Sequence, residues 1–169
     1  WNVKHTHYHI DFIPKLEFLP ILYSILAGIA FGICAAAFSK IIHWMGSVFK
    51  SKIKYPPLRP VAGGIIIALA VFAMGTTRYI GLGIPVIVES FEKQLPLSDF
   101  ALKMIFTIVT LSAGFKGGEV TPLFFIGATL GSALSLFIPL PFGLLAGMGF
   151  VAVFAGATNT PLACMLMGI

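Results

Sequence analysis

The chain has 169 residues, of which 58% are hydrophobic and only 10% are charged. A soluble domain needs far more charge to cover its surface, so this composition excludes one and predicts a multi-pass integral membrane protein. The net charge of +5 comes without a basic patch interleaved with aromatic residues, so we predict no nucleic-acid partner.

The segment at 1–17 is polar and precedes the first apolar run. It contains His5, His7 and His9, an alternation that would place all three on one face of a strand. A metal site is conceivable there, but a polar segment before a helix accounts for the pattern. We therefore predict no metal and no cofactor.

The two ends of the chain predict a piece of a longer membrane protein. The chain starts at Trp1 without a methionine and stops at Ile169 inside an apolar run. Chemistry carried by other segments of that protein would not be visible in this sequence.

The first apolar run, Phe18–Phe38, has 21 residues and no charge. As a helix it would be about 31 Å long, which is enough to cross a bilayer, and we expect the helix to occupy 18–49. Gly28, Gly32 and Ala36 recur every fourth residue. Such a stripe lets another helix approach closely, so it predicts a helix–helix interface.

A basic loop is expected at 50–60, around two consecutive prolines. The tendency of positively charged loops to remain inside would place it in the cytoplasm. Its basic residues are Lys50, Lys52, Lys54 and Arg59.

The rest of the chain forms short apolar segments that are separated by glycine and proline. Such interrupted segments are typical of transporters and channels, where irregular backbone lines a polar cavity. The segments are Val61–Met74, Pro85–Phe91, Phe100–Ala113, Leu123–Ile138, Phe142–Ala155 and Pro161–Ile169.

Small residues within two of these segments also predict helix interfaces. Gly127 and Gly131 have GxxxG spacing, and so do Gly143 and Gly147. Lys103 stands near the start of its segment, where we expect its side chain to extend to the membrane interface.

The segment Gly114–Pro122 places charged residues between two apolar runs. Gly117 and Gly118 permit a tight turn, and we expect Pro122 to open the next helix. The first amides of a helix have no partners within it and lie at the positive end of its dipole. This arrangement predicts a site for a small anion, and the glycine spacing is not that of a nucleotide loop.

Glu119 has two interpretations. It can be a carboxylate placed favourably against the helix dipole, or a protonatable group beside a polar pathway through the membrane. Thr121 likewise can bond to the backbone of the first turn, or donate its hydroxyl to an anion and pass a proton.

Several stretches resemble the CLC family of chloride channels and anion/proton antiporters. The stretch around the charged turn is similar to the GGxFxP motif of that family and the helix that follows it. The stretches are "GFKGGEVTPLFFIGATLGSAL", "GMGFVAVFAGATNTPLACMLMGI", "YSILAGIAFGICAAAFSKIIHWM" and "GLGIPVIVESF", which together cover nearly all of the chain.

The resemblance implies an all-α integral membrane fold, a CLC-like bundle of short, tilted, broken helices. Residues 18–49 would be the last helix of the first structural repeat, and 61–169 would be part of the second, inverted repeat. The GGxxxP anion motif would be at 117–122. The resemblance also implies that the basic loop faces outside, in conflict with the charge rule.

The resemblance further implies roles for the motif. The Glu119 and Val120 amides would hold the anion, while Gly117, Gly118 and Pro122 shape the turn. The Glu-Val-Thr version is similar to the fluoride/proton antiporter branch, in which the side chains at Glu119 and Thr121 would help to move fluoride and protons.

Other parts of the family pattern differ or are missing. Gly81 and Gly83, in "GLGIP", would be turn glycines of the second repeat and not anion ligands. The gating glutamate of a GREGP-like motif and the central tyrosine do not occur in this sequence.

We therefore expect transport of a halide, most specifically fluoride/proton antiport. A passive chloride channel of the voltage-gated type and a membrane scaffold without transport are the alternatives. The expected partners are a halide ion, protons, the bilayer and a second copy of the chain, in the inner membrane of a bacterium. No catalytic set typical of a hydrolytic enzyme is visible.

Overall fold

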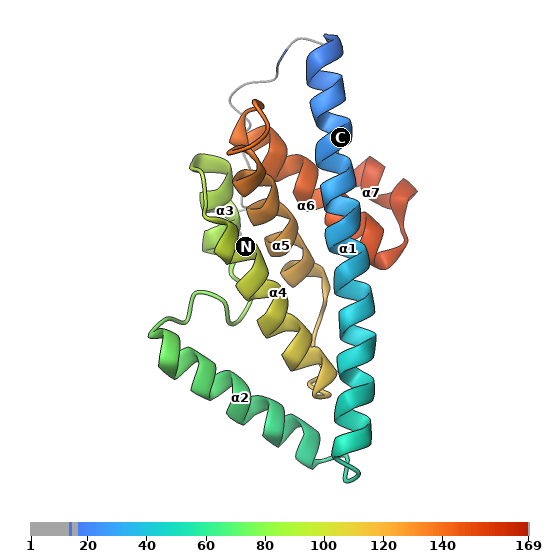
Figure 1. The fold of residues 1–169 in the computed structure, drawn as a ribbon, viewed down its shortest axis with the longest axis vertical. Helices are drawn as coiled ribbons and strands as arrows, with labels where there is room; N and C mark the ends of the chain where they lie inside the picture. The colour runs from blue at the N-terminus through green and yellow to red at the C-terminus, as the bar shows by residue number, and fades with distance from the viewer. Residues whose placement is uncertain (1–13, 15–16, 169) are drawn as a thin grey trace, which may run out of the picture.

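The computed structural model describes Pro14 and residues 17–168, and within them it contains seven α-helices and no strand. This confirms the all-α prediction, whereas His5, His7 and His9 lie outside the described residues. The helices are α1 (Phe18–Lys52), α2 (Leu58–Met74), α3 (Ile84–Glu92), α4 (Leu97–Ser112), α5 (Val120–Leu134), α6 (Phe142–Thr158) and α7 (Pro161–Met167), shown in Figure 1.

The first helix is the longest element of the chain. α1 has 35 residues, and among the described residues it alone is long and apolar enough to cross a membrane by length and composition. Lys50 and Lys52 lie in its last turn, where positive charge is favourable to the helix dipole. The loop between α1 and α2 is therefore shorter than predicted, because the helix continues through these lysines.

The core lies where α5 packs against α6, with α1 and α4 beside them. A Cβ atom on Gly127 would overlap the Gly149 carbonyl, and one on Gly131 would overlap the Leu145 carbonyl. The two backbones therefore approach as closely as glycine allows. On α6, the residue that contacts Gly127 is Gly149. The two glycines of α6 that were predicted to form an interface, Gly143 and Gly147, are buried and half-buried, respectively.

The glycine stripe of α1 lies on an open face. Both Gly28 and Gly32 are exposed, and among the described residues no atom lies within 4 Å of a Cβ built on either one. A different stripe of α1, including Phe31 and Phe38, is buried in the core. The interface predicted at Gly28 and Gly32 therefore stays a prediction about a partner.

Both boundaries of α5 differ from the predicted ones. α5 begins at Val120, so Pro122 is its third residue and not its opening one. It ends at Leu134, four residues before the predicted end at Ile138, and Ser135–Phe137 form a turn. The prolines that follow restrict the residues before them to extended backbone, which favours this earlier end.

The helix α2 stands apart from the α5–α6 pair and packs against α4 (Figure 1). Among the residues of α2, only Gly63 is fully buried. It packs so closely against Ala113, just after α4, that an added Cβ atom would overlap that residue. The space between α2, α4 and the start of α5 contains the hollow described next.

Candidate anion site

The motif occupies a turn between two helices. α4 ends at Ser112, Gly114 adopts φ of +95°, and α5 begins at Val120. Every residue from Gly114 to Val120 is exposed in this chain, whereas Thr121 and Pro122 are half-buried. The turn therefore presents its backbone at a surface of the chain.

The amide groups at the start of α5 are free to bind a ligand. Among the described residues, the Glu119, Val120 and Thr121 amides donate no hydrogen bond. The first bonded amide of α5 belongs to Leu123, which donates to the Glu119 carbonyl at 3.1 Å. Unpartnered amides at the positive end of a helix dipole attract a small anion.

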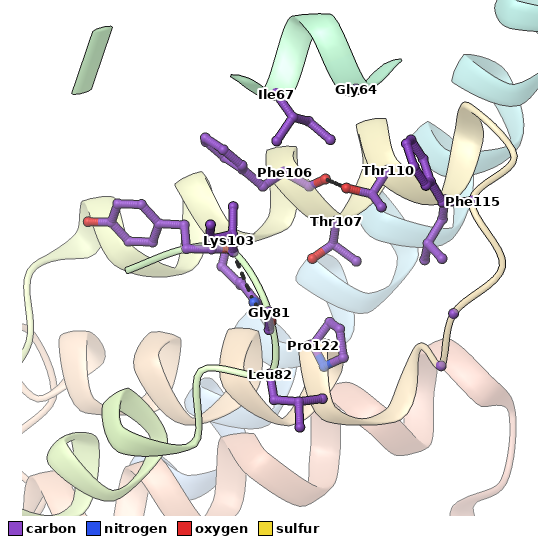
Figure 2. A pocket seen from close by; sticks show the side chains of 15 residues that line it. Gly64, Ile67, Gly81, Leu82, Lys103, Phe106, Thr107, Thr110, Phe115 and Pro122 are labelled. Carbon is purple, nitrogen blue, oxygen red and sulfur yellow. Dashed lines mark hydrogen bonds between the residues drawn. The ribbon is translucent and has the colours of Figure 1, made fainter. Parts of the chain in front are cut away.

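A hollow of about 510 Å³ adjoins the motif. Figure 2 shows its walls, which come from α2, α4, the loop after α2 and the motif turn. The motif contributes Gly117, Gly118 and Pro122, and apolar side chains such as Phe106 and Phe115 supply much of the remaining wall.

A second hollow, of about 480 Å³, lies beside Glu119. It is lined by three basic residues that are far from Glu119 in sequence, namely His43 and Lys50 of α1 and Arg59 of α2. Among the described residues, no cation lies within 4 Å of the Glu119 carboxylate. From the sequence, Lys50 and Arg59 were predicted only to be residues of the basic loop, since nothing in their spacing connects them to Glu119.

Lys103 does not extend to the membrane interface, which corrects the prediction. It is only 1% exposed, and its Nζ donates to the Gly81 carbonyl at 2.6 Å and to the Tyr79 carbonyl at 3.1 Å. The Nζ also lies 4.9 Å from the centre of the Phe125 ring. Two carbonyls and a ring face replace water around the ammonium group, which is why it can remain buried.

The loop between α2 and α3 is held by an ion-pair cluster that the sequence did not reveal. Arg78 contacts Glu89 at 2.6 Å and Asp99 at 3.0 Å, and the Tyr79 hydroxyl donates to Asp99 at 2.8 Å. These residues lie up to 21 positions apart, so only the folded backbone brings them together.

The turn glycines of "GLGIP" adopt the conformation expected of them. Gly81 has φ of +67° and Gly83 has φ of +68°, a region that glycine enters without strain. Gly81 also lines the first hollow, near Pro122 of the motif (Figure 2).

The structure therefore divides the predicted site residues between two hollows. Gly117, Gly118 and Pro122 line the first hollow, and Glu119 lines the second. The side chains of Val120 and Thr121 line neither of these two hollows.

Comparisons with known proteins agree on the family. Residues 1–169 match the sequence profile of the family described as voltage gated chloride channel. The chain is 51% identical over 175 residues to a chloride/fluoride channel protein of Pseudomonas syringae pv. tomato, a match that covers all of this chain and 39% of that protein.

A comparison with a solved structure supports the same family. The fold is similar to the crystal structure of a CLC-type fluoride/proton antiporter, with a TM-score of 0.87 and 34% identity. That match covers 92% of this chain and 40% of the antiporter chain, so the chain spans about two fifths of the length of both relatives. The chain belongs to the voltage-gated chloride channel (CLC) family.

Proposed function

We propose that this chain is part of a longer CLC-type transporter that exchanges fluoride for protons. The observation that carries the proposal is the set of unbonded amides at Glu119, Val120 and Thr121, beside a hollow lined by Gly117 and Gly118. Fluoride is in the names of both relatives, whereas chloride is in the name of one, and this supports fluoride as the proposed anion.

The two hollows suggest separate roles for the backbone and the side chain of the motif. The amides would hold the anion, while the Glu119 carboxyl, beside His43, Lys50 and Arg59, would exchange protons with water. The Thr121 hydroxyl would assist the anion or the proton at the first turn of α5.

The arrangement of the longer protein is also part of the proposal. Residues 18–49 would be the last helix of the first repeat, and 61–169 would belong to the second, inverted repeat. The exposed glycine face of α1, with Gly28 and Gly32, would pack against a second copy of the protein. The proposed location is the inner membrane of a bacterium.

The first test is transport by the full-length protein in liposomes. We expect efflux of fluoride faster than efflux of chloride, and we expect a fluoride gradient to drive protons uphill. Anion flux that never moves protons would support the passive chloride channel, and no flux of either anion would support a scaffold without transport.

Glu119→Gln tests the proposed proton role. The substitution keeps the size of the side chain and removes its titration, so we expect proton coupling to fall at least tenfold while the protein stays folded. The measurement is the ratio of protons to fluoride moved in liposomes. The matched control is Glu92→Gln, because Glu92 is exposed and lines neither hollow. An unchanged ratio in Glu119→Gln would reject the role.

A further inference from the structure

The wall of the first hollow opposite the motif carries two polar side chains of α4. Lys103 and Thr107 are one helical turn apart, so they lie on the same face of α4, and both line the hollow. Lys103 is 1% exposed and Thr107 is 7% exposed. Polar groups this deeply buried need a specific reason to be there.

Thr107 differs in its hydrogen bonding from the other threonines that lie beyond the first turn of a helix. Thr110, Thr129 and Thr158 each donate their hydroxyl to the carbonyl one turn earlier, at 2.7–2.8 Å. Among the described residues, the Thr107 hydroxyl has no hydrogen-bond partner, and it faces the hollow. The hydroxyl is therefore accessible from the hollow, where a ligand could accept a hydrogen bond from it.

Lys103 keeps this wall from repelling an anion. Its ammonium group binds the Tyr79 and Gly81 carbonyls, whose partial negative charges would otherwise be uncompensated at the edge of the hollow. No carboxylate of the described residues lies within 4 Å of its Nζ. The positive charge is therefore not cancelled at close range, and the apolar surroundings weaken its screening.

We propose that Lys103 and Thr107 form a second anion subsite on α4, opposite the motif amides. The Thr107 hydroxyl donates to a small halide in the hollow, and the Lys103 charge stabilises that halide. The ligand is a dehydrated fluoride ion, because apolar walls such as Phe106 and Phe115 leave few other donors for it. This subsite deepens the proposed function and depends on it.

The experiment measures the fluoride concentration that gives half-maximal transport by the full-length protein in liposomes. Thr107→Val removes the hydroxyl and keeps the shape, so we expect that concentration to rise about tenfold. Thr129→Val is the matched control, because the Thr129 hydroxyl is buried and bonded within α5, and it should leave the concentration within about twofold.

Lys103 is tested with two variants that separate its charge from its hydrogen bonds. Lys103→Gln can still donate to the two carbonyls but lacks the charge, and we expect a rise of at least about tenfold in half-maximal concentration. Lys103→Arg keeps the charge and should remain within about threefold of wild type. Fluoride titration of the purified variants by calorimetry should show the same order.

The outcomes distinguish this inference from the proposed function. Wild-type transport of fluoride with an unchanged half-maximal concentration in Thr107→Val would overturn the subsite and leave the proposed function intact. Equal losses in Lys103→Gln and Lys103→Arg would overturn the role of the charge and leave Lys103 as a support for the loop. An absence of fluoride transport by wild type would overturn both proposals.

Discussion

Two glycine-rich segments of this chain each lead into an apolar helix, yet they differ in how other parts of the chain contact them. The segment at Gly81–Gly83, before α3, is fixed by side chains. Lys103 donates to the Gly81 carbonyl, and Arg78 anchors the preceding loop to Glu89 and Asp99. The segment at Gly114–Gly118, before α5, is exposed and has open space around Gly117 and Gly118.

The difference shows why similar local sequence can serve two purposes. Where the protein's own groups occupy the backbone, as at Gly81, the loop is a structural element. Where the amides that follow the glycines remain unbonded, as at Glu119 and Val120, the backbone can bind a ligand. Three substitutions test this distinction, in addition to those proposed above.

Gly83→Ala should have the largest effect on folding. The residue has φ of +68°, and an added Cβ would lie 2.5 Å from the fully buried ring of Phe125. Strained backbone and overpacking together should cost about 3 kcal/mol or more. The measurement is the thermal unfolding temperature of the full-length protein in detergent. A variant as stable as wild type would show that the loop is not fixed as described.

Asp99→Asn should have an intermediate effect. Asp99 is 2% exposed and accepts hydrogen bonds from Arg78 and Tyr79, so the loss of its charge weakens the bonds of a buried carboxylate. We expect a loss of about 1–3 kcal/mol in unfolding free energy. Lys93→Gln is the control, because the exposed Lys93–Glu89 pair should contribute less than about 1 kcal/mol. Equal effects of the two variants would contradict the buried role of Asp99.

Gly118→Ala should have the smallest effect on folding. Its φ is not positive, and no atom lies within 4 Å of the added Cβ, so stability should change by less than about 1 kcal/mol. The same unfolding measurement applies. If Gly118→Ala destabilised the protein as much as Gly83→Ala, the contrast between the two segments would be wrong.

Much of the fold could be predicted from the sequence, because hydrophobic runs and proline or glycine breaks are local signals. The unbonded amides before α5 could also be predicted, since they follow from a helix that begins after glycines. The start of α5 was placed at Pro122–Leu123 and not at Val120, because a proline is tolerated throughout the first turn and does not mark its first residue.

The wall of the first hollow that contains Lys103 and Thr107 could not be predicted from local patterns. Lys103 was expected at the membrane interface because its partners, the Tyr79 and Gly81 carbonyls, are more than 20 residues away and are backbone groups. Nothing in the sequence indicated a binding role for Thr107, since the hydroxyl of a single threonine in an apolar helix normally donates to the backbone of its own helix. Only the folded chain shows that it does not.

The contact between α5 and α6 has a consequence for motion. Gly127 and Gly149 touch through their main chains, so no side chain between them can rotate to permit sliding or tilting. Any displacement of α5 would have to carry α6 with it as one rigid body. The orientation of the dipole that α5 directs at the motif is thereby fixed. The flanking segments would then have to provide the movement that the proposed transport cycle requires.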